Sequence, residues 1–190
     1  MNGIDRVIRV LTAPGVWIRS FWVHLLCRIW AVPVTETRLF QNKATFGHLQ
    51  HMAPPTVGAA FAIGFVPALL NRLLALLLFL SSLLGLFLFR MTGWVALSAN
   101  TLAFWFAFSL YVNTYPPAEH ARRMQTMLRG QGTRAQKILL APGTFCCAVG
   151  SFLERCGVTF LLACAGLAAL VLWQGALFAA IARWLPNLEG

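Results

Sequence analysis

The chain has 190 residues, of which 59% are hydrophobic and only 11% are charged, and its mean hydropathy is +0.72. Soluble domains carry roughly 25% charged residues, so this composition excludes an ordinary soluble domain and predicts an all-α integral membrane protein. The 15 Lys and Arg against 5 Asp and Glu give a formal net charge of +10. In a membrane protein such an excess sets topology and contacts anionic lipid head groups, so we expect no nucleic-acid partner.

The N-terminal part is predicted to contain a surface helix and a first span. Residues 1–13 carry two arginines between apolar positions, a spacing that predicts a short amphipathic helix lying on the membrane. Residues 14–33 form the first predicted span, which starts with a Pro-Gly pair and ends at Pro33. Arg19 and His24 lie within this span, and charged groups in membrane helices usually face a protein interior or a cavity.

The longest polar break of the first half covers residues 34–54. It begins with VTETRLF, whose alternation predicts a short strand or the arm of a hairpin. His48 and His51 follow in GHLQH. Because Gly47 and Pro54 flank them, we expect these histidines in a loop.

The next stretch, residues 56–89, is almost wholly apolar and is interrupted only around Arg72. A helix needs about 20 residues to cross the hydrocarbon core, so this stretch is too long for one span. It predicts either a tight pair of spans, 56–71 and 73–89, or one long helix kinked at Pro67. We favour the pair, with Arg72 at the turn.

Two further spans are predicted in the second half, an aromatic-rich one over 91–112 and a last one over 157–182. Between them, residues 113–137 are predicted as a basic loop. Residues 138–153 are predicted as a short or re-entrant helix, because Pro142 and the glycine after it interrupt a short apolar run. In total the chain predicts a polytopic helical bundle of about 4–6 spans with an N-terminal amphipathic helix.

Some side chains are candidates for contact with lipid or with partner proteins. The basic loop supplies Arg122, Arg123 and Arg129 for anionic lipids, and the aromatic span supplies Trp94 and Trp105. Four predicted spans before the basic loop place it on the same side as the N-terminal arginines. Basic loops face the cytoplasm, so we predict the bacterial cytoplasmic (inner) membrane, with the mitochondrial inner membrane as the alternative.

The histidines leave open a catalytic alternative. A catalytic zinc site needs three protein ligands and an open water position, and His48, His51 and His120 would be that set. The chain has no HExxH motif, no Gly-x-Ser-x-Gly elbow and no phosphate-binding glycine loop. We therefore expect no metal and no cofactor, with zinc only under the alternative of a divergent intramembrane zinc hydrolase.

Three blocks, in order along the chain, share a pattern with a known family. The first block keeps Pro14, Gly15, Val16 and Cys27. The second keeps Gly47, His51, Pro54, Pro67 and Asn71. The third keeps Ser109, Leu110, Tyr115, Pro116 and Ala121. This framework resembles the small prokaryotic members of the site-2-protease type of intramembrane zinc metallopeptidase.

The resemblance implies that the catalytic positions have been lost. The first zinc histidine of the family falls on Arg19, the catalytic glutamate on Ser20 and the second histidine on Val23. A guanidinium opposes a cation, a serine does not replace a glutamate as general base, and valine has no donor atom. His120 stands at the aspartate of the third block. We therefore predict a pseudoenzyme, in which Arg19 pairs with a carbonyl or with Glu36.

Such a protein is expected to act by binding, as an accessory or structural subunit, or a scaffold, of a larger membrane complex. Its partners would be other membrane protein subunits. The predicted partner surfaces are the small-residue face of 56–64 and the aromatic face of 91–112. Besides the zinc hydrolase, a second alternative is a lipid or small-solute transporter, in which Arg19, Arg72 and Arg90 would line a path.

Overall fold

The computed structural model describes residues 10–38, 48–85, 93–169 and 172. Its elements are α2 (Ala13–Ile29), β1 (Val34–Arg38), β2 (His48–His51), α3 (Val57–Leu83), α4 (Trp94–Val112), α5 (Ala118–Gln131), α6 (Arg134–Arg155) and a short apolar helix, Val158–Ala169. Three of them, α3, α4 and α6, are long and apolar enough to cross a membrane. The prediction of an all-α membrane bundle is confirmed, with one small β-hairpin added to it.

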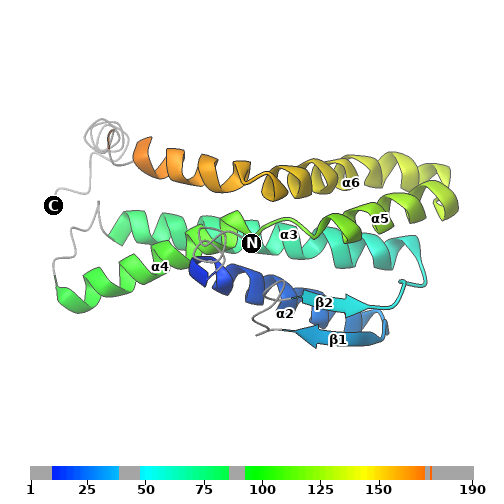
Figure 1. Ribbon diagram of the computed structural model, residues 1–190, viewed down its shortest axis with the longest axis horizontal. Coiled ribbons are helices and arrows are strands. Elements are labelled where there is room, and N and C mark those ends of the chain that lie inside the picture. The colour runs from blue at the N-terminus through cyan, green and yellow to red at the C-terminus, as the bar shows by residue number, and fades with distance from the viewer. Residues whose placement is uncertain (1–9, 39–47, 86–92, 170–171, 173–190) are drawn as a thin grey trace, which may run out of the picture.

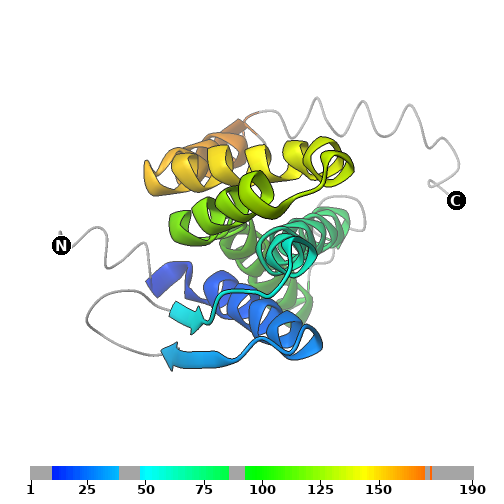
Figure 2. The ribbon, with the colours of Figure 1, turned by 90° about the vertical axis from the view of Figure 1, so that its right-hand side faces the viewer.

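Helix α3 is the centre of the bundle. It contacts α2, α4, α5 and α6, and Figure 1 shows it along the long axis of the molecule. Helices α4 and α5 follow one another along the same axis, and α6 runs back beside α5. Seen along that axis in Figure 2, α5 and α6 lie on one side of α3, whereas α2 and the hairpin lie on the other.

The predicted pair of spans, 56–71 and 73–89, is wrong. Val57–Leu83 forms one helix of 27 residues, as in the alternative of a single long helix. Asn71 is fully buried and donates hydrogen bonds to two carbonyls of neighbouring segments. Arg72 lies against two tyrosine rings. Because both polar side chains find partners in the protein, the chain needs no turn at this point.

The basic loop predicted over 113–137 is also wrong, because helix α5 occupies Ala118–Gln131. Pro117 directly precedes its first residue, and proline is tolerated where a helix starts, since no backbone donor is needed there. The apolar side chains of α5 recur every three or four residues and form its buried face: Ala121, Met124 and Leu128. The arginines lie on the opposite, exposed face.

The short or re-entrant helix predicted over 138–153 belongs to a longer one, α6, with 22 residues from Arg134 to Arg155. Its start is a capping box. The Thr133 hydroxyl accepts from the Gln136 N–H at 3.3 Å, and the Thr133 N–H donates to Gln136 Oε1 at 3.0 Å. Pro142 lies inside the helix without ending it.

The first predicted span, 14–33, is longer than the helix found there. Helix α2 has 17 residues and ends at Ile29, and it is followed by an antiparallel pairing of β1 with β2. The strand or hairpin arm predicted at VTETRLF is confirmed over Val34–Arg38, and its last two residues lie outside the described part of the chain. The loop predicted for His48 and His51 is wrong, because both residues belong to strand β2.

Three predicted segments extend beyond the described residues. The surface helix over 1–13 lies mostly outside them, since residues 1–9 are not described. The span 91–112 is confirmed over Trp94–Val112. The last span, 157–182, is described as a helix over Val158–Ala169, and most of its remainder lies outside the described residues.

Candidate functional site

The start of α2 packs directly on the last turn of α4. Gly15 lies so close to Ser109 that a Cβ on the glycine would collide with the Ser109 carbonyl. The Gly15 N–H donates to Ser109 Oγ at 2.8 Å, and that hydroxyl donates to the Thr12 carbonyl at 2.9 Å. Only a residue without a side chain permits this approach, which explains the glycine of the Pro-Gly pair.

Asn71 of α3 binds the place where the start of α2 crosses the last turn of α4. Its Nδ2 donates to the carbonyls of Gly15 and Asn113, each at 3.4 Å. Asn113 Nδ2 in turn donates to the Thr12 carbonyl at 2.9 Å. One buried amide therefore joins α2, α3 and the end of α4.

The backbone between α4 and α5 is not helical, so polar groups of Tyr115 and Pro116 lack the hydrogen-bond partners that a helix would provide. In a membrane protein such groups need partners from the protein itself. The Tyr115 N–H donates to Glu154 Oε2 at 3.0 Å, and the Tyr115 carbonyl accepts from Arg19 Nη1. The Pro116 carbonyl accepts from Ser151 Oγ at 2.6 Å. Side chains of α2 and α6 thus satisfy the α4–α5 junction.

Arg19 also forms an ion pair with Glu154, at 3.2 Å between Nη1 and Oε1. The two side chains are only 12% and 22% exposed. The predicted carbonyl partner of Arg19 is therefore confirmed, and its carboxylate partner comes from α6. The side chain of Glu36, the other predicted partner, lies outside what the structure describes.

Ser20 and Val23, the other two positions that the resemblance aligns with catalytic residues, are buried in the protein interior. Ser20 is buried, and its hydroxyl donates to the Val16 carbonyl at 2.9 Å. Val23 belongs to an apolar cluster whose buried members are Val23, Cys27, Val32, Leu49 and Ile63. Neither side chain presents a metal ligand.

Of the three histidines in the alternative zinc set, the structure brings two together. The rings of His51 and His120 meet edge to face, with their centroids 4.8 Å apart. His51 Nδ1 also lies 2.7 Å from the Met52 carbonyl oxygen. The side chain of His48 is not described. Within the described residues, no three His, Cys, Asp or Glu side chains are placed to hold a metal ion together.

The arginines predicted to line a transport path have different surroundings. The guanidinium carbon of Arg72 lies 5.3 Å from the ring centroids of both Tyr111 and Tyr115. Arg19 is occupied by its ion pair, and Arg90 is outside the described residues.

The predicted contact residues on the surface are mostly exposed. Trp94 is 83% exposed at the start of α4, and the exposed face of α5 carries Arg122, Arg123 and Arg129. Trp105 is half-buried, and its Nε1 donates to the Leu11 carbonyl at 2.9 Å. Trp105 therefore holds the residues just before α2 against α4.

Part of the small-residue face predicted over 56–64 packs inside this chain. Ala60 and Gly64 are buried within the chain itself. A Cβ on Gly64 would lie 3.0 Å from the sulfur of Met124 in α5. The small residues allow close packing of α3 on α5.

Comparison with protein-family models, with curated proteins and with solved structures finds no match to this chain. The resemblance to site-2-protease-type metallopeptidases therefore rests on the three sequence blocks alone and stays a prediction. Sequence reasoning missed the role of Glu154. The available signal was a lone carboxylate beside an apolar segment, since such a charge requires a partner.

Proposed function

We propose that this chain is a non-catalytic membrane protein that serves as an accessory or structural subunit, or a scaffold, of a larger membrane protein complex. The observation that supports this proposal most is the use of Arg19. At the position that the resemblance aligns with a zinc histidine, a guanidinium is held by a carboxylate and a carbonyl.

The chemistry of this arrangement favours structure over catalysis. A zinc ion next to Arg19 would meet a fixed positive charge. Displacing Arg19 would leave Glu154 without its cation and the Tyr115 carbonyl without this donor. The three groups together stabilise the contact between α2, the α4–α5 junction and α6, which is a packing role.

Partner contacts are proposed for two surfaces. The start of α4 exposes Trp94 and Val95 by 83% and 85%, and this apolar face suits another membrane subunit. The basic face of α5 suits anionic head groups. The count of four spans before residues 113–137 no longer holds, because α3 is one helix. The three long apolar helices support a membrane location, and the bacterial cytoplasmic membrane stays our proposal, with the mitochondrial inner membrane as the alternative.

The test is the mass of the protein after gentle detergent extraction from its native membrane. We expect an assembly well above the 21.0 kDa of one chain, with partner subunits in fixed stoichiometry. Trp94→Ala should weaken the assembly. Trp30→Ala, at a site 40% exposed beside the hairpin, is the control and should not. A chain that is always recovered alone, as a monomer, would contradict the proposal.

The contact between His51 and His120 favours a second candidate, a divergent zinc hydrolase. Two imidazoles within 4.8 Å supply two of the three ligands that a catalytic zinc requires. This candidate predicts one zinc per purified chain, lost on His51→Ala and retained on His24→Ala.

A further inference from the structure

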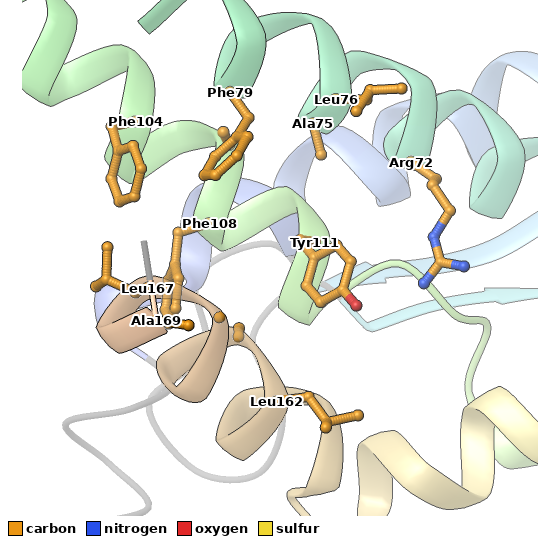
Figure 3. A pocket seen from close by; sticks show the side chains of 13 residues that line it. Arg72, Ala75, Leu76, Phe79, Phe104, Phe108, Tyr111, Leu162, Leu167 and Ala169 are labelled. Carbon is orange, nitrogen blue, oxygen red and sulfur yellow. The ribbon is translucent and has the colours of Figure 1, made fainter. Parts of the chain in front are cut away.

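An apolar cavity lies between α3, α4 and the Val158–Ala169 helix. Its volume is about 720 Å³, which is within the range of roughly 300–1,000 Å³ for sites of small organic ligands. Figure 3 shows the rings and aliphatic side chains that form its wall: Phe79, Phe104, Phe108, Leu162 and Leu167. Such a wall suits a hydrocarbon chain.

Arg72 brings a positive charge to this cavity. In Figure 3, Arg72 and Tyr111 lie on one side of it, and Phe104 and Leu167 lie on the other. The guanidinium rests against two tyrosine rings, which stabilise a cation through their faces.

No carboxylate in the described part of the chain neutralises Arg72. Glu154 is engaged by Arg19 and by the Tyr115 N–H, and Glu119 is exposed on α5. A charged side chain in a membrane protein is costly unless it is paired or reaches water. A guanidinium binds a carboxylate through two parallel hydrogen bonds. Arg72 is exposed where it lines the cavity, within the apolar helix α3, so an anionic ligand in the cavity would complete this site.

We propose that the cavity binds a long-chain fatty acid, with its carboxylate on Arg72 and its acyl chain along the aromatic wall. One carboxylate carries the single negative charge that one guanidinium compensates. One acyl chain, rather than the two chains of a phospholipid, suits a cavity of about 720 Å³. The site assigns Arg72 a ligand-binding role in addition to its contact with the tyrosines.

The first test compares two ligands that have the same hydrocarbon chain but different head groups. Full-length protein in nanodiscs is titrated with radiolabelled oleate and with oleyl alcohol, which lacks the charge. We expect oleate to bind at least about tenfold more tightly, since hydrogen bonds to charged groups are worth that much. Arg72→Gln should abolish this preference and Arg72→Lys should keep most of it. Arg28→Gln, at an exposed position near the end of α2, is the control and should change nothing.

The second test fills the cavity. Gly166 lines it, and a Cβ there would meet no atom within 4 Å, so Gly166→Phe should fold normally. We expect it to weaken oleate binding at least about tenfold by occupying the space of the acyl chain. Gly130→Phe, at an equally open position on α5, is the matched control and should bind oleate normally.

Two results would overturn the proposal. One is equal affinity of the unmodified protein for oleate and oleyl alcohol. The other is oleate binding that survives both Arg72→Gln and Gly166→Phe. Because Gly166→Phe leaves Arg72 in place, unweakened oleate binding by Gly166→Phe alone would overturn the proposal if Arg72→Gln impairs folding.

Discussion

Arg19 of α2 and Glu154 of α6 form an ion pair of 3.2 Å across 135 residues of sequence. Both side chains also bind the backbone of Tyr115, Arg19 through its carbonyl and Glu154 through its N–H. Three segments that are far apart in the chain therefore meet at one residue, Tyr115. Gly150 of α6 completes this contact, since a Cβ there would collide with the Tyr115 ring.

Removing the cation of this pair should destabilise the protein. We expect Arg19→Ala to lower the free energy of unfolding by about 2 kcal/mol or more, because Glu154 would stay in place without its partner charge. The measurement is the thermal midpoint in detergent. Arg28→Ala, at an exposed position on the same helix, is the control and should leave the midpoint unchanged.

A double-mutant cycle separates the ion pair from other effects of the substitution. Arg19→Met combined with Glu154→Leu should cost less than the sum of the two single changes, with a coupling of about 1–3 kcal/mol. Simple additivity, or an unchanged midpoint in Arg19→Ala, would show that the pair has no structural role.

The crossing of α2 and α4 should tolerate no side chain at Gly15. The obstacle is the backbone carbonyl of Ser109, which cannot rotate away, so we expect Gly15→Ala to cost about 1–3 kcal/mol. Gly58→Ala is the matched control, because the nearest atom to its Cβ would be 3.9 Å away. Thermal unfolding of the two variants side by side measures the difference, and equal midpoints would refute the tight crossing.

The buried amide of Asn71 should matter more than a hydroxyl that bonds within its own helix. Asn71→Ala removes the donor to Gly15 and Asn113 and leaves a void, at an expected cost of about 2–3 kcal/mol. Thr101→Ala removes a hydrogen bond to the Leu97 carbonyl of its own helix and should cost less. Unfolding in detergent ranks the two, and the reverse order would contradict the role of Asn71.

The basic face of α5 should act on lipids without supporting the fold. We expect the triple variant Arg122→Gln, Arg123→Gln, Arg129→Gln to unfold like the unmodified protein in zwitterionic nanodiscs, because all three side chains are exposed. In anionic nanodiscs it should lose the extra stability that basic residues gain there, about 1 kcal/mol each. If the triple variant kept all of the extra stability in anionic nanodiscs, the basic face of α5 would not be the surface that binds anionic lipids.

The features predictable from sequence were those that depend on local pattern. Hydropathy identified the membrane class, and the alternation of VTETR identified the strand Val34–Arg38. The start of α6 also has a local signal, the Thr133–Gln136 capping box. The full length of α6 was not predictable, because a proline such as Pro142 usually indicates a break in a helix. Helix α5 was predicted as a loop because its clustered arginines dominate the sequence, although its apolar residues recur with helical spacing.

The remaining features depend on contacts between distant segments. Helix α3 continues through Asn71 because carbonyls 56 and 42 residues away accept its amide hydrogens, and no local pattern reveals them. The partner of Arg19 lies 135 residues away on α6. The cavity beside Arg72 needs three helices to form its wall.

The central claim, that this is a membrane protein without catalysis, is tested most directly by the zinc content of the chain extracted from its native membrane. Elemental analysis and native mass are measured on the same sample. We predict a larger assembly with zinc far below one ion per chain. A single chain with one bound zinc, lost on His51→Ala, would contradict the claim and make the chain a metalloenzyme.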